Sequence, residues 1–352
     1  RFFSGDSSMK AAVIHENGEL DVVRVEEVPE PAPGSGEVVL KVTCAGLNHL
    51  DIWVRKGRPG TSLSDTHILG SDAVGLVEEL GRDVEGVRVG DEVIVNPALS
   101  CGRCEFCARG QQSECPSFGI AGLSRPGTFA ERMVVPARNL WPKPAHLSVE
   151  EAGTLSLASV TAWRMLMTRA QVKPGEVVLI HGIGGGAALC ALRFAKLIGA
   201  EVIVTSSSDE KLARARELGA DHTIHYRSQD VAERVKEITA GRGVDVAVDS
   251  VGATTWPLDF ACVRRGGRIV TCGITTGAKA ETNLQALYWN QLTILGSTMG
   301  SNEDFRQMLR AVTVNRLRPV IDEVFTLDEV RQAMAKMEAG RQFGKIALRV
   351  AP

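Results

Sequence analysis

Short runs of alternating hydrophobic and polar residues dominate the first part of the chain. Glu37–Cys44 is an apolar, β-branched run typical of a strand, and Gly70–Leu80 and Asp91–Val95 repeat the pattern. Turn-forming residues such as Pro31 and Gly86 separate these runs. Short strands with frequent glycine turns predict an all-β, barrel-like first domain.

The pattern changes near Ser148, which precedes two acidic residues and predicts a helix N-terminus. Strand-like and helix-like segments then alternate. The strand-like segments are Glu176–His181, Glu201–Thr205, Val244–Ser250 and Gly267–Gly273, and the helix-like ones are Ala187–Ile198 and Asp209–Leu218. This alternation predicts an α/β domain with a doubly wound parallel sheet. Beyond Gly296, two helices and a closing strand at Lys345–Val350 are expected.

These patterns divide the chain into four parts. Residues 1–8 precede the first methionine, Met9, and are interpreted as a remnant of expression that is left outside both domains. The other parts are a β-rich domain at 9–150 with a cysteine lobe at 98–118, an α/β domain at 151–298, and a C-terminal segment at 299–352.

Composition excludes several function classes. The chain has 352 residues, of which 44% are hydrophobic and 23% charged, and its net charge is −2. These values are ordinary for a globular enzyme and give no reason to expect binding to nucleic acid or to an anionic membrane. No apolar run reaches the roughly 20 residues that span a bilayer, and no signal segment follows Met9. We therefore expect a cytoplasmic protein that acts on a small-molecule substrate.

A glycine-rich turn links the first strand of the α/β domain to its first helix. It contains Gly182, Gly184, Gly185, Gly186 and Ala187. Glycines let the backbone approach a pyrophosphate closely, and the helix N-terminus offers unpaired N–H groups. The position between strand and helix predicts a dinucleotide site, and the alternative is a turn that only packs the helix on the sheet.

The end of the second strand indicates which dinucleotide binds. Ser206 and Ser207 stand where NAD enzymes place an acidic residue for the ribose 2′-hydroxyl. Small hydroxyl residues leave room for a 2′-phosphate, and Lys211 can neutralise its charge, so we expect NADP(H), with NAD(H) as the alternative. Lys211 as a solvated helix residue is the other interpretation. Val251 and Gly273, at the ends of the two later strands, complete the expected cofactor site.

Four of the eight cysteines lie between positions 101 and 115, in the spacing C-x2-C-x2-C-x7-C. They are Cys101, Cys104, Cys107 and Cys115. Four thiolates in a short, glycine-bent loop predict a closed tetrahedral zinc site. An iron–sulfur cluster is the alternative, although the fourth cysteine is not at the ferredoxin spacing. A closed site leaves no open coordination position, so this zinc should stabilise the loop and take no part in catalysis.

Together these features resemble the medium-chain dehydrogenase/reductase superfamily over Met9–Pro352. The resemblance implies a GroES-like β-barrel domain with a zinc lobe, a Rossmann domain, and a C-terminal segment that returns to the first domain. The phrase Gly46-Leu-Asn48-His49-Leu50-Asp51 looks more like the quinone and enoyl reductase branch than the alcohol dehydrogenases. In that branch, residues matching Ser207, Lys211 and Tyr226 hold the 2′-phosphate, and one matching Thr161 lies near the nicotinamide ribose.

The likeness to alcohol dehydrogenases fails at their catalytic zinc. Those enzymes bind it with a Cys, a His and a second Cys, and the matching residues here are Asn48, Ser71 and Leu157. An amide, a hydroxyl and an alkyl side chain do not form a zinc site that can ionise an alcohol. The alternative is a second zinc recruited by neighbouring side chains, namely His49, His67 or Asp72.

Without a catalytic zinc, hydride delivery to a quinone or an α,β-unsaturated carbonyl remains feasible, because hydrogen bonds can hold the oxygen on which charge builds. We expect Asn48 to supply such a bond and His49 to supply the proton. Asp51 is a third candidate, and the favoured interpretation of this residue is a structural carboxylate. The alternatives are that Asn48 contacts only the ribose or the local backbone, and that His49 contacts only the pyrophosphate.

The leading hypothesis is therefore an NADPH-dependent reductase of quinones, enones or enoyl thioesters, with one structural zinc. An alcohol dehydrogenase with an unusual zinc site and a nucleotide-binding protein without turnover are the alternatives. The apolar, β-prone stretch Gln291–Gly296 predicts assembly as well. In the superfamily such a strand often lies at a sheet edge and pairs across a two-fold axis, which implies a homodimer or homotetramer.

Overall fold

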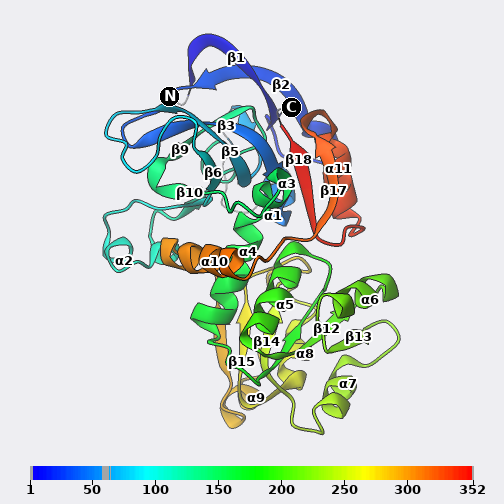
Figure 1. The fold of residues 1–352 in the computed structure, drawn as a ribbon. Helices are drawn as coiled ribbons and strands as arrows, with labels where there is room; N and C mark the ends of the chain where they lie inside the picture. The colour runs from blue at the N-terminus through cyan, green and yellow to red at the C-terminus, as the bar shows by residue number, and fades with distance from the viewer. Residues whose placement is uncertain (1–2, 58–62, 64, 351–352) are drawn as a thin grey trace. The chain divides into compact units, whose positions relative to one another are not determined.

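The computed structural model describes residues 3–57, 63 and 65–350, and the chain forms two compact units (Figure 1). Unit 1 is Arg1–Leu157 with Gly300–Pro352, and unit 2 is Ala158–Met299. Helix α4 (Ser156–Trp163) carries the chain from one to the other.

Helix α3 (Val149–Gly153) explains why the chain stays in unit 1 beyond residue 150. Ser148 is its N-cap, as predicted, and its side chain accepts the N–H of Glu151 at 3.2 Å. A Cβ atom on Gly153 would lie 2.7 Å from the carbonyl oxygen of Cys44. The helix therefore packs directly on the backbone of a unit 1 strand, and the boundary falls after it.

Unit 1 is built around a seven-stranded mixed sheet with the order β10-β6-β5-β3-β18-β17 and with β9 paired to β3. Its strands are β3 (Glu37–Gly46), β5 (Asp72–Leu80), β6 (Glu92–Val95), β9 (Arg132–Pro136), β10 (Leu140–Pro142), β17 (Ile321–Thr326) and β18 (Lys345–Arg349). The C-terminal strand β18 lies antiparallel to β3, with Ala347 opposite Gly46. This pairing brings the last segment of the chain beside the first part of the same unit.

The remaining elements of unit 1 surround this sheet. A smaller sheet has the order β2-β1-β4, with β1 (Phe3–Ile14), β2 (Arg24–Pro31) and β4 (His67–Ile68). The helices are η1 (Leu20–Val22), α1 (His49–Arg55), η3 (Ala137–Asn139), α10 (Asn302–Val314), η5 (Leu327–Glu329) and α11 (Val330–Glu338). In the cysteine lobe, β7 (Ala98–Leu99) and β8 (Gly119–Ile120) pair antiparallel around α2 (Glu105–Ala108) and η2 (Gln112–Glu114).

Residues Phe3–Ser8 belong to β1 and pair with β2, with Phe3 opposite Pro31 and Ser8 opposite Pro29. This stretch, which the sequence left outside the two domains, therefore extends the first strand of unit 1. The pairing is made by backbone N–H and C=O groups, and every residue type except proline carries both. It therefore needs no hydrophobic pattern in the sequence, and none predicted it. Residues 1 and 2 lie outside the described residues.

Unit 2 is a six-stranded parallel sheet with the order β13-β12-β11-β14-β15-β16. The strands are β11 (Val177–Ile180), β12 (Glu201–Ser206), β13 (His222–His225), β14 (Val244–Asp249), β15 (Val263–Thr271) and β16 (Thr293–Gly296). The helices are a π-helical turn, η4 (Arg164–Arg169), with α5 (Gly186–Ile198), α6 (Asp209–Glu217), α7 (Val231–Ile238), α8 (Trp256–Cys262) and α9 (Leu284–Trp289).

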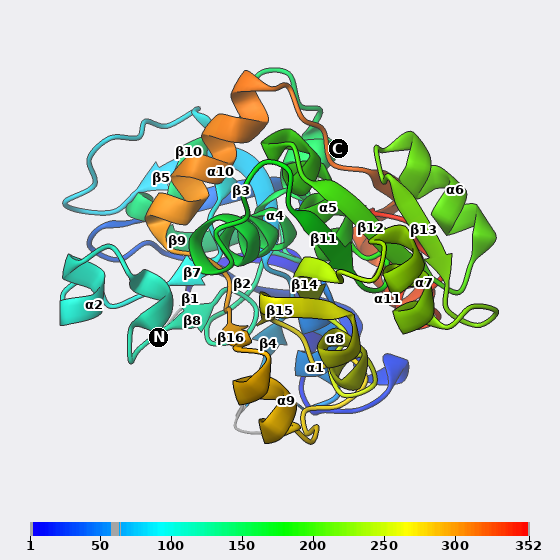
Figure 2. The same ribbon diagram turned by 90° about the horizontal axis from the view of Figure 1, so that it is seen from below.

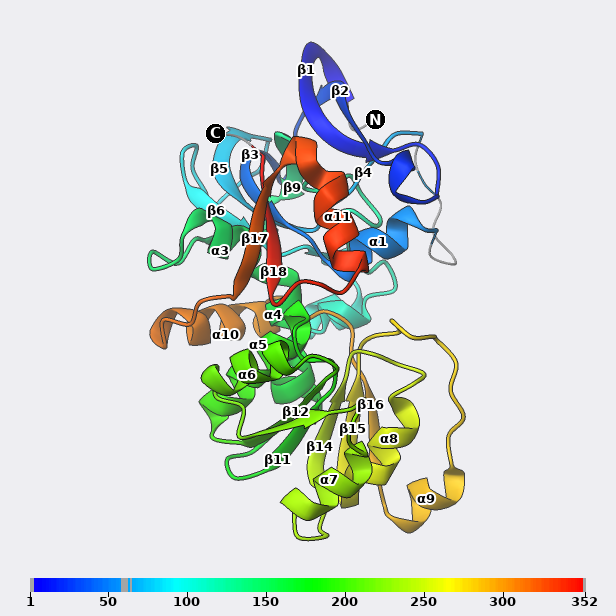
Figure 3. The same ribbon diagram turned by 90° about the vertical axis from the view of Figure 1, so that its right-hand side faces the viewer.

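The strand order of unit 2 reverses between β11 and β14, which is the arrangement of a doubly wound sheet. Helices α5 and α6 cover one face of this sheet, and α7 and α8 cover the other (Figure 3). Strand β16 lies at the edge, and α9 leads into it (Figure 2). The predicted α/β architecture, a β-rich domain and a parallel Rossmann-type sheet, is confirmed.

Candidate functional site

The glycine-rich turn of unit 2 connects β11 to α5. Gly182 and Gly184 adopt φ values of +67° and +119°, which side-chain-bearing residues rarely tolerate. Helix α5 begins at Gly186 with Gly185 as its N-cap. The N–H groups of the first helical turn have no partner within the helix, so they can receive a phosphate. The turn therefore has the conformation that a pyrophosphate site requires.

Lys211 lies against this turn. A Cβ atom on Gly184 would come within 2.9 Å of Lys211 Cδ and 3.4 Å of its Nζ. The lysine comes from the start of α6, where Ser208 caps the helix by accepting the N–H of Lys211 at 3.3 Å. Because Gly184 has no side chain, the Lys211 side chain can lie beside the turn and place its positive charge next to the phosphate-binding site.

The other residues predicted for the ribose phosphate gather at the ends of β12 and β13. The N–H of Tyr226 donates to the carbonyl of Ser206 at 3.0 Å, which joins the two strand ends. Tyr226 is 48% exposed, and Ser207 is half-buried beside Ser206. The structure therefore brings together Ser206, Ser207, Lys211 and Tyr226.

Of the three further residues predicted for the cofactor site, two follow strands of the unit 2 sheet and the third is buried in α4. Val251 follows β14, and a Cβ atom on Gly182 would lie 3.2 Å from its Cγ2. Gly273 follows β15, where a Cβ atom would lie 2.1 Å from the oxygen of Ser250, so only glycine fits. Thr161 is buried in α4, with its hydroxyl 3.8 Å from the sulfur of Met299.

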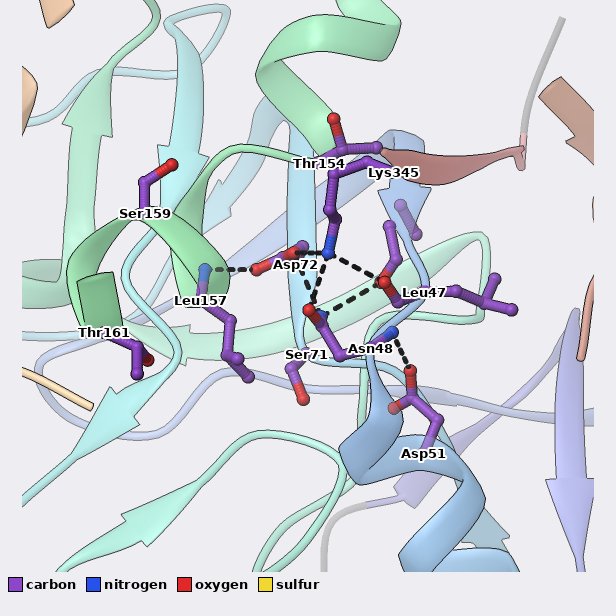
Figure 4. Close-up of polar contacts among 12 residues, drawn as sticks. Leu47, Asn48, Asp51, Ser71, Asp72, Thr154, Leu157, Ser159, Thr161 and Lys345 are labelled. Atoms are coloured by element: carbon purple, nitrogen blue, oxygen red, sulfur yellow. Dashed lines mark hydrogen bonds and ion pairs between the residues drawn. The ribbon is translucent and has the colours of Figure 1, made fainter. Parts of the chain in front are cut away.

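A buried lysine lies among the predicted catalytic residues of unit 1 (Figure 4). Lys345 Nζ donates to Leu47 O at 2.7 Å, to Asn48 Oδ1 at 2.6 Å and to Asp72 Oδ2 at 3.0 Å. An ammonium has three protons, and all three are used. The carboxylate of Asp72 also accepts the backbone N–H of Leu157, through Oδ1 at 2.6 Å. We call Leu47, Asn48, Asp72, Leu157 and Lys345 the Lys345 network.

The Lys345 network fixes the amide of Asn48 in one orientation. Lysine only donates and an ionised carboxylate only accepts, so the amide oxygen must face Lys345 and the amide nitrogen must face Asp72. Asn48 Nδ2 donates to Asp72 Oδ2 at 3.0 Å and to Gly46 O at 3.4 Å. Asn48 is 6% exposed. One amide proton is therefore firmly engaged, and the other makes only a long contact.

Asp51 and His49 lie at the start of α1, next to this network. Asp51 is buried and accepts the backbone N–H of Asn48 at 2.8 Å, which holds the helix start in place. Burial raises the pKa of Asp51 to about 7. Burial, followed by the charge of Lys345, lowers the pKa of His49, whose ring packs edge-on against Trp53 with centroids 6.3 Å apart. Both effects favour the neutral form of the His49 ring.

The three positions matching the zinc ligands of alcohol dehydrogenases have different partners here. The Asn48 amide belongs to the Lys345 network, and the Ser71 hydroxyl donates to Ala121 O at 2.8 Å. Leu157 contributes an alkyl chain and its backbone N–H. These donors are a poor set for zinc, which takes thiolate, imidazole and carboxylate ligands.

The cysteine lobe presents the opposite case. The four sulfur atoms of Cys101, Cys104, Cys107 and Cys115 all lie within 4.8 Å of one another. Sulfurs about 2.3 Å from a tetrahedral zinc would lie roughly 3.8 Å apart, and two of the pairs here are 3.6 and 3.9 Å apart. Backbone N–H groups of Arg103 and Cys104 lower the pKa of Cys101, which favours the thiolate that a zinc needs, whereas burial and the neighbouring thiols raise the pKa of Cys104. The four thiols fit a structural zinc.

Lys345 is the functional residue that the sequence did not indicate. It begins a short apolar strand, where a single lysine is usually solvated, and it lies 297 residues from Asn48 in the sequence. Only the pairing of β18 with β3 brings the two together.

Among the described residues, no helix has the length and apolar character needed to cross a membrane.

Comparisons with known proteins agree across both units. The alcohol dehydrogenase GroES-like domain family matches residues 34–145, and the zinc-binding dehydrogenase family matches residues 186–313. The chain is 34% identical to a zinc-type alcohol dehydrogenase-like protein of Schizosaccharomyces pombe, covering 96% of this chain and 98% of that protein.

Two solved structures extend the comparison. The crystal structure of an NAD-dependent alcohol dehydrogenase is 41% identical, with a TM-score of 0.93, covering 97% of this chain and 100% of that chain. The structure of a crotonyl-CoA carboxylase/reductase in complex with NADP is 26% identical, with a TM-score of 0.92, covering 99% and 96%. The names of these relatives thus include alcohol dehydrogenases and a crotonyl-CoA carboxylase/reductase.

Proposed function

The chain belongs to the zinc-type medium-chain dehydrogenase/reductase superfamily and is an oxidoreductase, and from that premise we propose that it reduces an activated double bond or a quinone with NADPH. The observation that carries the proposal is the Lys345 network. It ties Asn48 to a fixed ammonium at a position where alcohol dehydrogenases use a zinc ligand. A buried ammonium supplies charge but no open coordination position, so it cannot bind an alcohol and lower its pKa.

The residues of unit 1 suit an acceptor that is already polarised. NADPH, when bound, supplies the hydride that adds to the β-carbon of an enone or enoyl thioester. Negative charge then builds on the carbonyl oxygen of the acceptor, and a preorganised donor there lowers the barrier. The Asn48 proton that reaches Gly46 O only at 3.4 Å is the one left for this oxygen, and it can donate without any rotation of the amide.

Lys345 strengthens that donor. Its bond to Asn48 Oδ1 at 2.6 Å polarises the amide, and its charge favours an anion nearby. The α-carbon takes its proton from water or from His49 in its imidazolium form, and the lowered pKa of His49 makes that form a strong acid but a scarce one. Asp51 serves as a structural carboxylate at the start of α1. In this proposal Lys345 is a positioning residue, and Asn48 is the residue that touches the acceptor.

The cofactor preference is proposed from unit 2. Lys211 lies against the glycine-rich turn, and β12 ends in serines without an acidic side chain. A carboxylate there would hold the 2′-hydroxyl of NADH and repel the 2′-phosphate of NADPH. We therefore favour NADPH. The likeness to an NADP-bound crotonyl-CoA carboxylase/reductase favours an enoyl thioester among the possible acceptors.

One structural zinc and a homodimer complete the proposal. The zinc would bind Cys101, Cys104, Cys107 and Cys115. These cysteines form no disulfide, which suits a reducing compartment such as the cytoplasm. The dimer would form through the edge strand β16, since an open strand edge tends to pair with another strand. Near it, α9 exposes Leu284, Tyr288 and Trp289 at 69%, 67% and 63%.

A matched screen tests the activity. The purified chain is mixed with NADPH and with crotonyl thioester, an enone, a benzoquinone or an aldehyde, and absorbance of the cofactor is followed. The proposal expects turnover with the first three classes and very slow oxidation of simple alcohols by NADP+. Alcohol oxidation as the best reaction would favour a dehydrogenase, and binding without turnover of any acceptor would favour a nucleotide-binding protein.

A further inference from the structure

A second buried polar cluster lies in unit 2, directly below the glycine-rich turn. His181 is the residue before Gly182, and it is 1% exposed. Its Nε2 lies 3.0 Å from Oδ1 of Asp259, a fully buried residue of α8. Because an ionised carboxylate only accepts, Nε2 carries the proton and Nδ1 of the ring is an acceptor.

The accepting nitrogen faces the neighbouring strand β12. Thr205 Oγ1 lies 3.5 Å from His181 Nδ1, so its hydroxyl donates to the ring, and this is the longest link of the chain. The same oxygen accepts the N–H of Gly182 at 3.2 Å. A directed series of hydrogen bonds therefore runs from Gly182 through Thr205 and His181 to Asp259. It fixes the peptide at the first residue of the turn.

The loop after β14 is held by a carboxylate beside the same cluster. Asp249 is fully buried and accepts the N–H groups of Val251 at 2.6 Å and Gly252 at 3.0 Å. It also accepts the hydroxyl of Thr255, and the carbonyl of Thr255 accepts the N–H of Asp259 at 3.0 Å. The two loops assigned to the cofactor are thus anchored to one buried group of side chains.

We propose that His181, Thr205 and Asp259 are positioning residues for the dinucleotide, which set the peptide of Gly182 for pyrophosphate binding. The inference rests on the proposed cofactor site at the glycine-rich turn. None of the three side chains needs to touch the cofactor, and the pyrophosphate is common to NADPH and NADH. The cluster therefore controls the affinity for both cofactors equally, whereas Lys211 discriminates between them.

The test uses the full chain and three variants, with dissociation constants for NADPH and NADH measured by isothermal titration. Thr205→Val keeps the β-branched shape of a strand residue but removes both hydroxyl contacts. It should raise both constants by the same factor, about three- to tenfold, as expected when the Gly182 peptide loses its one hydrogen bond to Thr205. Asp259→Leu should do the same or more, whereas Asp259→Asn keeps an acceptor for His181 and should bind like the wild type.

A control separates positioning from general destabilisation. Asp245 lies at the other end of β14, is 2% exposed, and pairs with Arg242 and Arg264. Asp245→Asn should lower the Tm while leaving both dissociation constants unchanged. Wild-type affinity in folded Thr205→Val and Asp259→Leu, or a loss confined to NADPH, would overturn the inference. A wild-type chain that binds neither cofactor would overturn the proposed function as well.

Discussion

Two places in unit 1 match the metal sites of zinc dehydrogenases in sequence. One keeps a full set of metal-binding side chains, and the other does not. The cysteine lobe keeps four thiols within 4.8 Å of one another. The Lys345 network has an amide oxygen, a backbone carbonyl and a carboxylate gathered around one ammonium. The first place offers everything that a closed zinc site needs, and the second offers little that a zinc would bind.

The difference separates the stability of the fold from its chemistry. A closed thiolate site acts on a loop, and its spacing can persist whatever reaction the enzyme performs. A catalytic site follows the reaction, so the proposed change of substrate would be accompanied by a change of its ligands. In the proposal Lys345 keeps this space ordered in place of a metal, because a buried charge must be matched by acceptors on all sides. The predictions below test each half of this contrast.

The largest effect is expected in the cysteine lobe. Cys104→Ser should remove the zinc and lower the Tm by about 10 °C, because a structural zinc contributes several kcal/mol to folding. The acceptor specificity of the remaining folded enzyme should not change. Metal analysis with thermal unfolding measures both. Cys190→Ser, outside the lobe, is the control and should retain the zinc, and an equal loss in both variants would remove the distinction.

The second effect is expected in the Lys345 network. Asn48→Ala removes the proposed donor, so turnover should fall by about 10²–10³-fold, as for a lost oxyanion donor. Stopped-flow measurement of NADPH oxidation separates this from binding. Asn139 is a second buried asparagine of unit 1, with both amide protons donated to backbone carbonyls. Asn139→Ala should lower stability and leave the rate per folded molecule intact, and near-full activity in Asn48→Ala would contradict the mechanism.

The third effect concerns the cofactor preference of unit 2 and tests whether NADPH is bound in preference to NADH. Lys211→Ala should weaken NADPH binding about 10- to 100-fold, the range for a lost hydrogen bond to a charged group, and leave NADH binding nearly unchanged. Fluorescence titration with each cofactor measures this. Lys196→Ala removes a lysine of α5 that pairs with Asp221 and should affect neither cofactor. Equal losses for both cofactors in Lys211→Ala would assign Lys211 a different role.

The smallest effect is a pH dependence of stability. Burial raises the pKa of Asp51 from 3.8 to about 7, so the folded state holds this proton more tightly than the unfolded state. The resulting stability is present below pH 3.8 and is lost as the pH rises through about 7. Relative to Asp51→Asn, the wild type should therefore lose stability across that window in urea unfolding. Parallel curves for the two proteins would contradict this assignment.

The features that the sequence predicted are those set by neighbouring residues. Ser148 caps α3 through a contact three residues away, and the four cysteines of the lobe lie between positions 101 and 115. The glycine-rich turn likewise lies between adjacent elements. Strand β13 was missed because its short polar sequence, His222–His225, has no apolar alternation, and β17 was missed for the same reason at Ile321–Thr326. Both strands depend on a neighbour for their hydrogen bonds.

The part of the candidate site that the sequence could not reveal depends on long-range pairing. Asn48 was identified from its local phrase, but its partner Lys345 reaches it only because β18 joins β3. The partner changes the expected chemistry, because the amide oxygen and one amide proton of Asn48 are already engaged. The chain from Gly182 to Asp259 has the same character, since His181 and Asp259 are 78 residues apart.

Zinc stoichiometry measured on the same sample as reductase activity tests the central claim most directly. The account predicts about one zinc per chain, full NADPH-dependent reduction of an activated alkene at that content, and no gain in activity when zinc is added. Two zincs per chain, with activity that rises in proportion to the second, would contradict it and would assign the site around Asn48 to an alcohol dehydrogenase with an unusual set of ligands.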